Sequence, residues 1–110
     1  MTPVTDNDLS AKIAAMRSSG ESAPLATLTS FEWQEVFCYY EGTPADEFNK
    51  EVGSEVFKPG SYPMVSGALA IFTKEGKVVR SLVIPEINFS KGKQPAGVVL
   101  EKGFELAAPK

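Results

Sequence analysis

The stretch "ALAIFTKEGKVVRSLVIP", residues 68–85, is the strongest structural signal in this chain. It contains two apolar runs separated by Glu75 and Gly76, with a lysine on each side. Glycine readily adopts the positive φ that tight hairpin turns require. Pro85 ends the second run, because proline has no N–H to donate to a neighbouring strand. The stretch therefore predicts an antiparallel β-hairpin whose charged turn lies in solvent.

Other stretches also have the composition of β-strands. In "FEWQEVFCYYEG", residues 31–42, aromatic and β-branched residues alternate, and the second half is apolar on both faces. This pattern predicts a strand that runs into the middle of a sheet. The run "MVSGALAIF", residues 64–72, leads into the hairpin, and its small residues indicate a helix packed close over the sheet. Residues 98–106, "VVLEKGFEL", predict one or two last strands, with Gly103 at a bulge or turn.

The stretch "DNDLSAKIAAMR", residues 6–17, predicts a helix. Acidic and amide side chains at its start suit an N-terminal cap and the positive end of the helix dipole. Leu9, Ile13 and Met16 form one apolar stripe at helical spacing, and Gly20 marks the end of the helix.

The stretch "TPADEFNKEVG", residues 43–53, predicts a second, shorter helix. Thr43 is expected to be the N-cap, and Pro44 to occupy the first helical position. Acidic residues follow in the first turn, where the helix dipole favours them, and Gly53 ends the helix.

Together these elements predict an α+β fold: a four- to five-stranded, mostly antiparallel sheet with two helices packed on one face. The expected order is helix, strand, helix, hairpin, and then the C-terminal strand or strands. The 110 residues suffice for a single domain with one core. We expect residues 1–5 and 107–110 to be flexible tails.

The composition argues against several functional classes. Eleven Lys and Arg stand against 14 Asp and Glu, so the net charge of −3 does not provide the basic face that nucleic acid requires. The chain contains no histidine, which removes histidine zinc sites and the commonest general base. It also contains no glycine-rich phosphate loop and no nucleophile motif. We therefore expect no enzyme activity, no metal and no cofactor.

Cys38 is the one cysteine, so no intramolecular disulfide can form. It lies in an apolar run, which is typical of a small core hydrophobe, and no histidine is available to activate it. The longest nearly uncharged stretch, residues 59–73, is too short and too rich in Gly and Pro to span a bilayer. The N-terminus lacks the basic end and apolar run of a signal peptide.

Trp33, Phe37, Tyr39 and Tyr40 form the first group of candidate binding residues. Their rings could line a ligand pocket or present a binding face. The alternative is that they belong to the core, with the polar tips of Trp33 and Tyr39 at its rim.

The second group lies in "PEINFSKGKQPAG", residues 85–97, the longest irregular stretch inside the predicted domain. It places Ile87 and Phe89 beside Lys91 and Lys93. Apolar and positive side chains together suit a protein surface or an anionic membrane interface. The alternative is that Ile87 and Phe89 fold back to close the core and leave the lysines in water.

Charge is distributed unevenly along the chain. Residues 31–57 contain seven acids and one base, whereas residues 73–93 contain five bases and two acids. This asymmetry could guide a charged partner or a membrane surface. It could equally belong to two solvated faces that attract each other weakly.

The strand, the second helix and the hairpin together resemble small bacterial envelope lipoprotein domains of unknown function. Those domains have a "W-D-x-V" strand, a helix ending in Gly and a hairpin reading "F-x-K-x-G-K-V-V". The positions that fit are Trp33, Val36, Gly53, Phe72, Lys74, Gly76, Lys77, Val78 and Val79. Gln34 replaces the usual Asp, and "EG" at 41–42 replaces a "P-Y" step. The resemblance implies a domain outside the cytoplasm, tethered through a lipidated N-terminal cysteine that this sequence does not contain, and it supplies no catalytic residues.

We therefore expect a non-enzymatic binding domain of the bacterial cell envelope, periplasmic or membrane-tethered, of the inhibitor or immunity type. Its expected partner is another protein. A carrier of a small apolar ligand, with a pocket between sheet and helices, is the alternative function. A cytoplasmic location is the alternative to the envelope. The sequence specifies neither the partner nor the oligomeric state.

Overall fold

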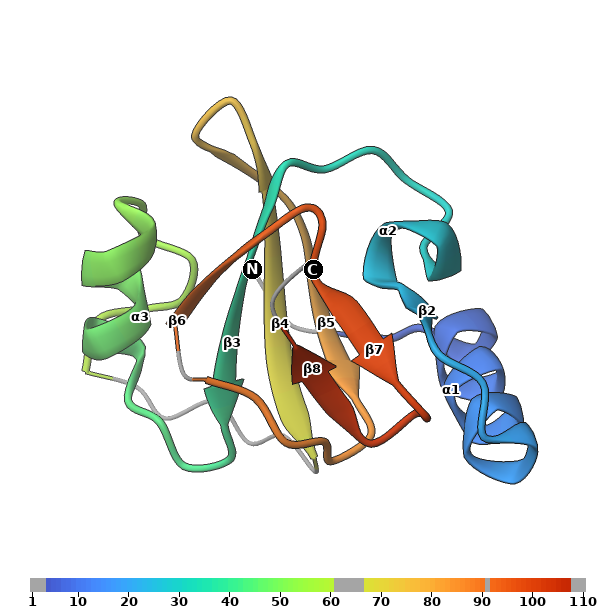
Figure 1. Ribbon diagram of the computed structural model, residues 1–110. Coiled ribbons are helices and arrows are strands. Elements are labelled where there is room, and N and C mark those ends of the chain that lie inside the picture. The colour runs from blue at the N-terminus through green and yellow to red at the C-terminus, as the bar shows by residue number, and fades with distance from the viewer. Residues whose placement is uncertain (1–3, 61–66, 91, 108–110) are drawn as a thin grey trace.

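The computed structural model describes residues 4–60, 67–90 and 92–107. Its elements, labelled in Figure 1, are β1 (Val4–Thr5), α1 (Asn7–Ser19), β2 (Ala23–Pro24), α2 (Leu25–Leu28), β3 (Glu35–Tyr40), α3 (Ala45–Val52), β4 (Ala68–Lys74), β5 (Lys77–Ile84), β6 (Gly92–Pro95), β7 (Val99–Glu101) and β8 (Glu105–Ala107). Five strands form the main sheet in the order β1-β5-β4-β3-β6, and β2-β7-β8 form a smaller antiparallel sheet. In the main sheet β1 pairs with β5 in parallel, and the other pairs are antiparallel. The predicted α+β class with a mostly antiparallel sheet is confirmed.

The hairpin of β4 and β5 is the one predicted from residues 68–85. Glu75 and Gly76 form its turn with φ angles of 52° and 77°, and Lys74 pairs with Lys77 across it. Two consecutive positive φ angles characterise the mirror-image turn whose twist matches that of the flanking strands. The part of the predicted strand at residues 64–66 lies outside the described residues.

Strand β3 occupies the interior of the main sheet, as its doubly apolar second half predicted. It pairs with β4 on one side and with β6 on the other. The strand begins at Glu35, so the prediction that it starts at Phe31 is corrected. The preceding rings pack against Phe72 from outside the ladder: the centroids of Phe31 and Trp33 each lie 5.0 Å from that of Phe72.

The buried side chains form two apolar clusters, one on each face of the main sheet. The cluster on the α1 face consists of Leu9, Ile13, Met16, Leu25, Trp33, Val36, Cys38, Ala68, Ala70, Phe72, Leu82, Ile84, Ile87, Phe89, Val98, Leu100 and Leu106. The cluster on the α3 face consists of Phe37, Tyr39, Ala45, Phe48, Val56, Phe57, Leu69 and Ile71. The predicted placement of both helices on one face is therefore corrected: α1 and α3 lie on opposite sides of the sheet (Figure 1). Because β3 and β4 are apolar on both faces, each face needs its own cover.

A β-bulge interrupts the hairpin ladder. Phe72 pairs with Arg80 and Thr73 pairs with Val78, which leaves Val79 without a partner in the ladder. An extra residue in one strand turns the following side chains to the other face. Val79 accordingly packs against the α1-face cluster, whereas its neighbour Val78 packs against the α3-face cluster.

Helix α1 has the caps and the buried stripe that the sequence predicted. A side-chain oxygen of Asp6 accepts a hydrogen bond from the backbone N–H of Leu9 at 3.0 Å. Gly20 adopts the left-handed conformation, and its N–H donates to the carbonyl of Met16. Leu9, Ile13 and Met16 are buried.

Helix α3 differs from its prediction at the first turn. Pro44 is the N-cap and the helix begins at Ala45. Thr43, which was expected to cap the helix, donates its hydroxyl to the carbonyl of Tyr40 at 2.8 Å. Gly53 ends the helix in the left-handed conformation, as predicted.

The predicted flexible tails contribute to the sheets. Val4 and Thr5 pair with β5, and Ala107 pairs with Val99. The prediction of tails at 1–5 and 107–110 is corrected at these three positions, because ladder hydrogen bonds hold them. The remaining tail residues lie outside the described part of the chain.

Candidate functional site

The segment Glu86–Ser90 connects the main sheet to the small one. The N–H of Asn88 donates to the carbonyl of Phe104, and the N–H of Leu106 donates to the carbonyl of Asn88, each at 2.8 Å. The segment therefore runs parallel to β8 in an extended conformation, in which successive side chains alternate between two sides. Ile87 points into the core, while Glu86, Asn88 and Ser90 are exposed.

An open hollow of about 320 Å³ lies at one end of this segment, and we name it the Tyr40 hollow. Its described lining consists of Tyr40, Asn88, Phe89, Ser90, Glu105 and Leu106. The Tyr40 ring stacks on the Phe89 ring with a centroid separation of 4.2 Å and an interplanar angle of 14°. The Tyr40 hydroxyl donates to the Phe89 carbonyl at 2.8 Å, and 43% of the residue remains exposed.

Three polar side chains of the Tyr40 hollow have no partner among the described residues. Asn88, Ser90 and Glu105 form neither a side-chain hydrogen bond nor an ion pair with residues 4–60, 67–90 and 92–107. The three side chains are exposed, so their bonding positions are accessible from solvent. The hollow therefore offers an amide, a hydroxyl and a carboxylate to a ligand.

A second open hollow of about 330 Å³ adjoins the first, and we name it the Phe104 hollow. Its described lining consists of Arg17, Glu86, Ile87, Asn88 and Phe104. Asn88 lines both hollows, which makes them neighbours on one surface. Phe104 is the last residue of the β7–β8 turn, and 52% of it is exposed.

Arg17, near the end of α1, fixes the position of the Phe104 hollow. Its Nε donates to the Gly103 carbonyl and its Nη2 to the Glu86 carbonyl, each at 2.7 Å. Its guanidinium carbon lies over the Phe104 ring, 4.7 Å from the centroid. One side chain thus joins the helix to the turn of the small sheet and to the connecting segment.

The first predicted group does not form one pocket. Trp33 lies on the α1 face, where its Nε1 donates to the Thr29 hydroxyl at 2.9 Å. Phe37 and Tyr39 lie on the α3 face and are buried. Only Tyr40, the last residue of β3, reaches either hollow. The core interpretation therefore describes the first three residues, and the surface interpretation describes the fourth. The expected position of the Tyr39 hydroxyl at the rim is corrected, because this hydroxyl is buried.

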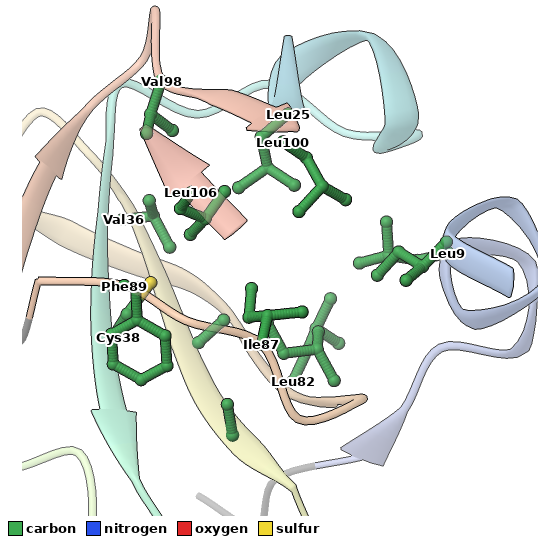
Figure 2. Packing of buried hydrophobic residues seen from close by; sticks show 14 of the residues in the cluster. Leu9, Leu25, Val36, Cys38, Leu82, Ile87, Phe89, Val98, Leu100 and Leu106 are labelled. Atoms are coloured by element: carbon green, nitrogen blue, oxygen red, sulfur yellow. The ribbon is translucent and has the colours of Figure 1, made fainter. Parts of the chain in front are cut away.

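The second predicted group divides between core and surface. Ile87 and Phe89 are 4% and 8% exposed, and Figure 2 shows them among the residues of the α1-face cluster. They close the core, as the alternative interpretation of the loop proposed. Lys93 lies in β6, with its Nζ 3.4 Å from a carboxylate oxygen of Glu35. Lys91 lies outside the described residues. The loop prediction is also corrected at Gly92–Pro95, because these residues pair with β3.

Cys38 and Tyr39 are buried titratable groups with raised pKa values. Burial raises the pKa of the Cys38 thiol to about 12, so the thiol remains protonated at neutral pH. Burial, and then the negative charge of Glu51, raise the pKa of the Tyr39 hydroxyl well above its ordinary value. A protonated thiol is a poor nucleophile, which agrees with the prediction of Cys38 as a core residue.

The described part of the chain offers no group of three His, Cys, Asp or Glu side chains that could hold a metal ion. Nor does any helix within the described ranges have the length and apolarity needed to cross a membrane. Comparison of the chain with family models, curated proteins and solved structures finds no match.

Several residues of this surface were missed by the sequence predictions, namely Arg17, Asn88, Phe104 and Glu105. Arg17 is the last residue of the predicted helix at 6–17, and nothing in the local sequence distinguishes it as a site residue. The position of Phe104 gave a weak indication of exposure, because a large aromatic residue directly after a turn glycine lies at the end of a hairpin, away from the core. Asn88 alternates with Ile87 and Phe89, so burial of those two residues would have placed it outside.

Proposed function

We propose that this protein is a non-enzymatic protein-binding domain, and that the Tyr40 hollow and the Phe104 hollow together form its binding surface. One observation supports this most strongly. Among the described residues, Tyr40 and Phe104 are the large hydrophobic residues that remain exposed, and each lines one of two adjacent hollows. Exposed aromatic side chains at concave positions are typical of the residues that dominate binding energy in protein interfaces.

The two aromatic side chains are held before any partner arrives. Tyr40 is fixed by its stack on Phe89 and by its hydroxyl hydrogen bond. Phe104 is covered on one side by the Arg17 guanidinium. Side chains that are already ordered lose little conformational entropy on binding, so more of the contact energy appears as affinity.

We further propose a location in the bacterial cell envelope and a role of the inhibitor or immunity type. The support for both is the resemblance of the strand, the second helix and the hairpin to small envelope lipoprotein domains. An inhibitor or immunity protein acts by covering part of another protein, which requires a recognition surface and no catalytic group.

The carrier of a small apolar ligand is the competing function. An enclosed apolar cavity between sheet and helix would favour it. The Tyr40 hollow and the Phe104 hollow are instead open, and Glu105 and Asn88 contribute polar groups to the Tyr40 hollow. These features favour a protein partner.

Selection of displayed random peptides on the immobilised protein tests the proposed surface. We expect enriched peptides to lose about tenfold or more in affinity when Tyr40 and Phe104 are both replaced by Ala. Leu28→Ala in α2, a half-buried position that lines neither hollow, is the matched control. An amide NMR spectrum of each variant verifies that it folds. Peptides that bind the double variant as tightly as the parent would overturn the proposal.

A further inference from the structure

We propose that the Tyr40 hollow binds an arginine side chain of the partner protein, an inference that rests on the proposed protein-binding function. It starts from the hydrogen-bonding capacity of the hollow. Glu105 supplies a carboxylate, which only accepts hydrogen bonds, and Ser90 and Asn88 add a hydroxyl oxygen and an amide oxygen. A guanidinium has five N–H donors and no acceptor, so it complements this set.

The aromatic wall of the hollow favours arginine over lysine. Tyr40 uses one ring face for its stack on Phe89, and 43% of the residue remains exposed. A planar guanidinium can lie on such a ring and still direct N–H groups at a neighbouring carboxylate. An ammonium group is compact and strongly hydrated, so it gains less from the same ring.

The neighbouring Phe104 hollow already contains this arrangement within the chain itself. Arg17 lies over the Phe104 ring and donates to two carbonyl oxygens. Its positive charge disfavours a second cation in that hollow. An arginine from the partner is therefore directed to the Tyr40 hollow, and the partner residue that reaches the exposed face of Phe104 is expected to be apolar.

The charge of the protein also favours a cationic partner segment. The net charge of the chain is −3, and Glu105 places one carboxylate in the hollow itself. Glu41 follows Tyr40 directly and is exposed. The net negative charge, with the carboxylate of Glu105 in the hollow, raises the local concentration of positively charged segments and accelerates their association.

An NMR titration of the labelled protein with N-acetylarginine amide tests the inference without a known partner. This probe has the side chain of interest and no charged ends. We expect saturable shifts of the amide signals of Asn88, Ser90, Glu105 and Leu106. N-acetyllysine amide is expected to bind about threefold more weakly, and N-acetylnorleucine amide to leave these signals unchanged.

Two substitutions that each remove one negative charge distinguish recognition of the guanidinium in the hollow from general electrostatic attraction to the protein. Glu105→Gln should weaken binding of N-acetylarginine amide about threefold to tenfold, because it removes the charge and keeps the shape. Glu55→Gln, at an exposed position after α3, changes the net charge equally and should have no effect. Equal affinity for norleucine amide, an unchanged affinity in Glu105→Gln, or no saturable shift at these four amides would each overturn the inference.

The titration and the peptide selection can fail separately. If selected peptides depend on Tyr40 and Phe104 yet contain no arginine, the binding surface is supported and the arginine site is overturned. If N-acetylarginine amide binds in a Glu105-dependent manner while no selected peptide depends on the surface, the guanidinium site is supported and the protein-binding function fails.

Discussion

The guanidinium of Arg17 lies over the ring of Phe104, with its central carbon 4.7 Å from the ring centroid. The same guanidinium donates to the carbonyls of Gly103 and Glu86, each at 2.7 Å. A single side chain from α1 therefore holds the turn between β7 and β8 and the segment that leads out of β5. Both hollows depend on this arrangement, because Asn88 and Phe104 are positioned by the segments that Arg17 joins.

Replacing Arg17 with Ala should destabilise the protein. The change removes two charged hydrogen bonds and a cation–π contact, and we expect the free energy of unfolding to fall by about 1–3 kcal/mol in urea melts. Arg17→Lys should recover only part of this loss, because a lysine cannot donate to two carbonyls with a planar fork. The control is Lys12→Ala on the same helix, which removes one exposed hydrogen bond to Leu28 and should cost less than about 0.5 kcal/mol. Equal losses in Arg17→Ala and Lys12→Ala would contradict the bridging role.

Gly103 and Gly76 form a matched pair of turn glycines. Both have a φ of 77° and both occupy the second position of a hairpin turn. A Cβ at Gly76 would meet no atom within 4 Å, whereas one at Gly103 would lie 2.7 Å from the Cγ of Arg17 and 2.8 Å from the carbonyl oxygen of Ile13. Gly76→Ala should therefore cost about 1 kcal/mol for the backbone conformation alone.

Gly103→Ala should lower the free energy of unfolding by about 2–4 kcal/mol, because the clash with α1 adds to the same backbone strain. The difference between the two variants in thermal or urea melts measures how tightly the β7–β8 turn packs on the helix. If both variants lose the same stability, the turn is free to move away from α1, and Phe104 is not held in a fixed position before binding.

The buried thiol of Cys38 should make stability depend on alkaline pH. Its pKa is raised by burial to about 12 in the folded state, whereas an unfolded cysteine titrates near 8.5. Since the folded state retains the proton that the unfolded state releases, this contribution is complete below about pH 8.5 and is lost as pH rises toward 12. The loss is about 1.4 kcal/mol per pH unit inside that window.

Urea melts of the parent and of Cys38→Ala, made at neutral pH and at about pH 9.5, isolate this contribution, because the groups other than neighbouring Tyr39 titrate equally in both proteins. The stability of the parent should fall about 1 kcal/mol further than that of Cys38→Ala over this interval. Tyr39, whose pKa is also raised by burial, adds a similar loss at higher pH in both proteins. Parallel pH profiles would mean that the thiol is accessible in the folded state.

The sequence predicted the parts of the fold that depend on neighbouring residues. The cap of α1 at Asp6, the end of α3 at Gly53 and the turn at Gly76 follow from local backbone chemistry. The bulge at Val79 was missed, because an apolar run does not reveal where one residue leaves the ladder. The two-sided apolar pattern of β3 placed that strand in the interior, yet the same pattern cannot indicate which face each helix covers.

The small sheet and the candidate site are formed by contacts between distant parts of the chain. Strand β2 has two residues and pairs with β7, so no periodic pattern could identify it. Arg17 and Gly103 are separated by 86 positions, and Tyr40 and Phe89 by 49. A surface assembled from such pairs has no local sequence signature. The sequence shows each aromatic residue, but it does not show which distant residues lie beside it in the fold.

Phe89 lines the Tyr40 hollow as a buried residue and Phe104 lines the Phe104 hollow as an exposed one, so truncation should affect the stability of the protein to different extents. Phe89 is 8% exposed, belongs to the α1-face cluster and supports the Tyr40 ring, so Phe89→Ala should cost about 3–5 kcal/mol of stability. Phe104 is 52% exposed, so Phe104→Ala should cost only about 0.5–1 kcal/mol, chiefly the cation–π contact with Arg17. Urea melts of the two variants measure this contrast directly.

The affinity for a selected peptide should depend on the exposed Phe104 ring, in variants that remain folded. Phe104→Ala should weaken capture of a selected peptide by about tenfold, because an ordered and exposed ring supplies contact area at little entropic cost. Tyr40→Phe is a milder change, because it keeps the ring over Phe89 and removes only the hydrogen bond to the Phe89 carbonyl. It should lower the free energy of unfolding by about 1 kcal/mol and leave the peptide affinity nearly unchanged. A large loss of stability in Phe104→Ala would show that this ring belongs to the folded core, and the binding surface would then have to be sought elsewhere on the molecule.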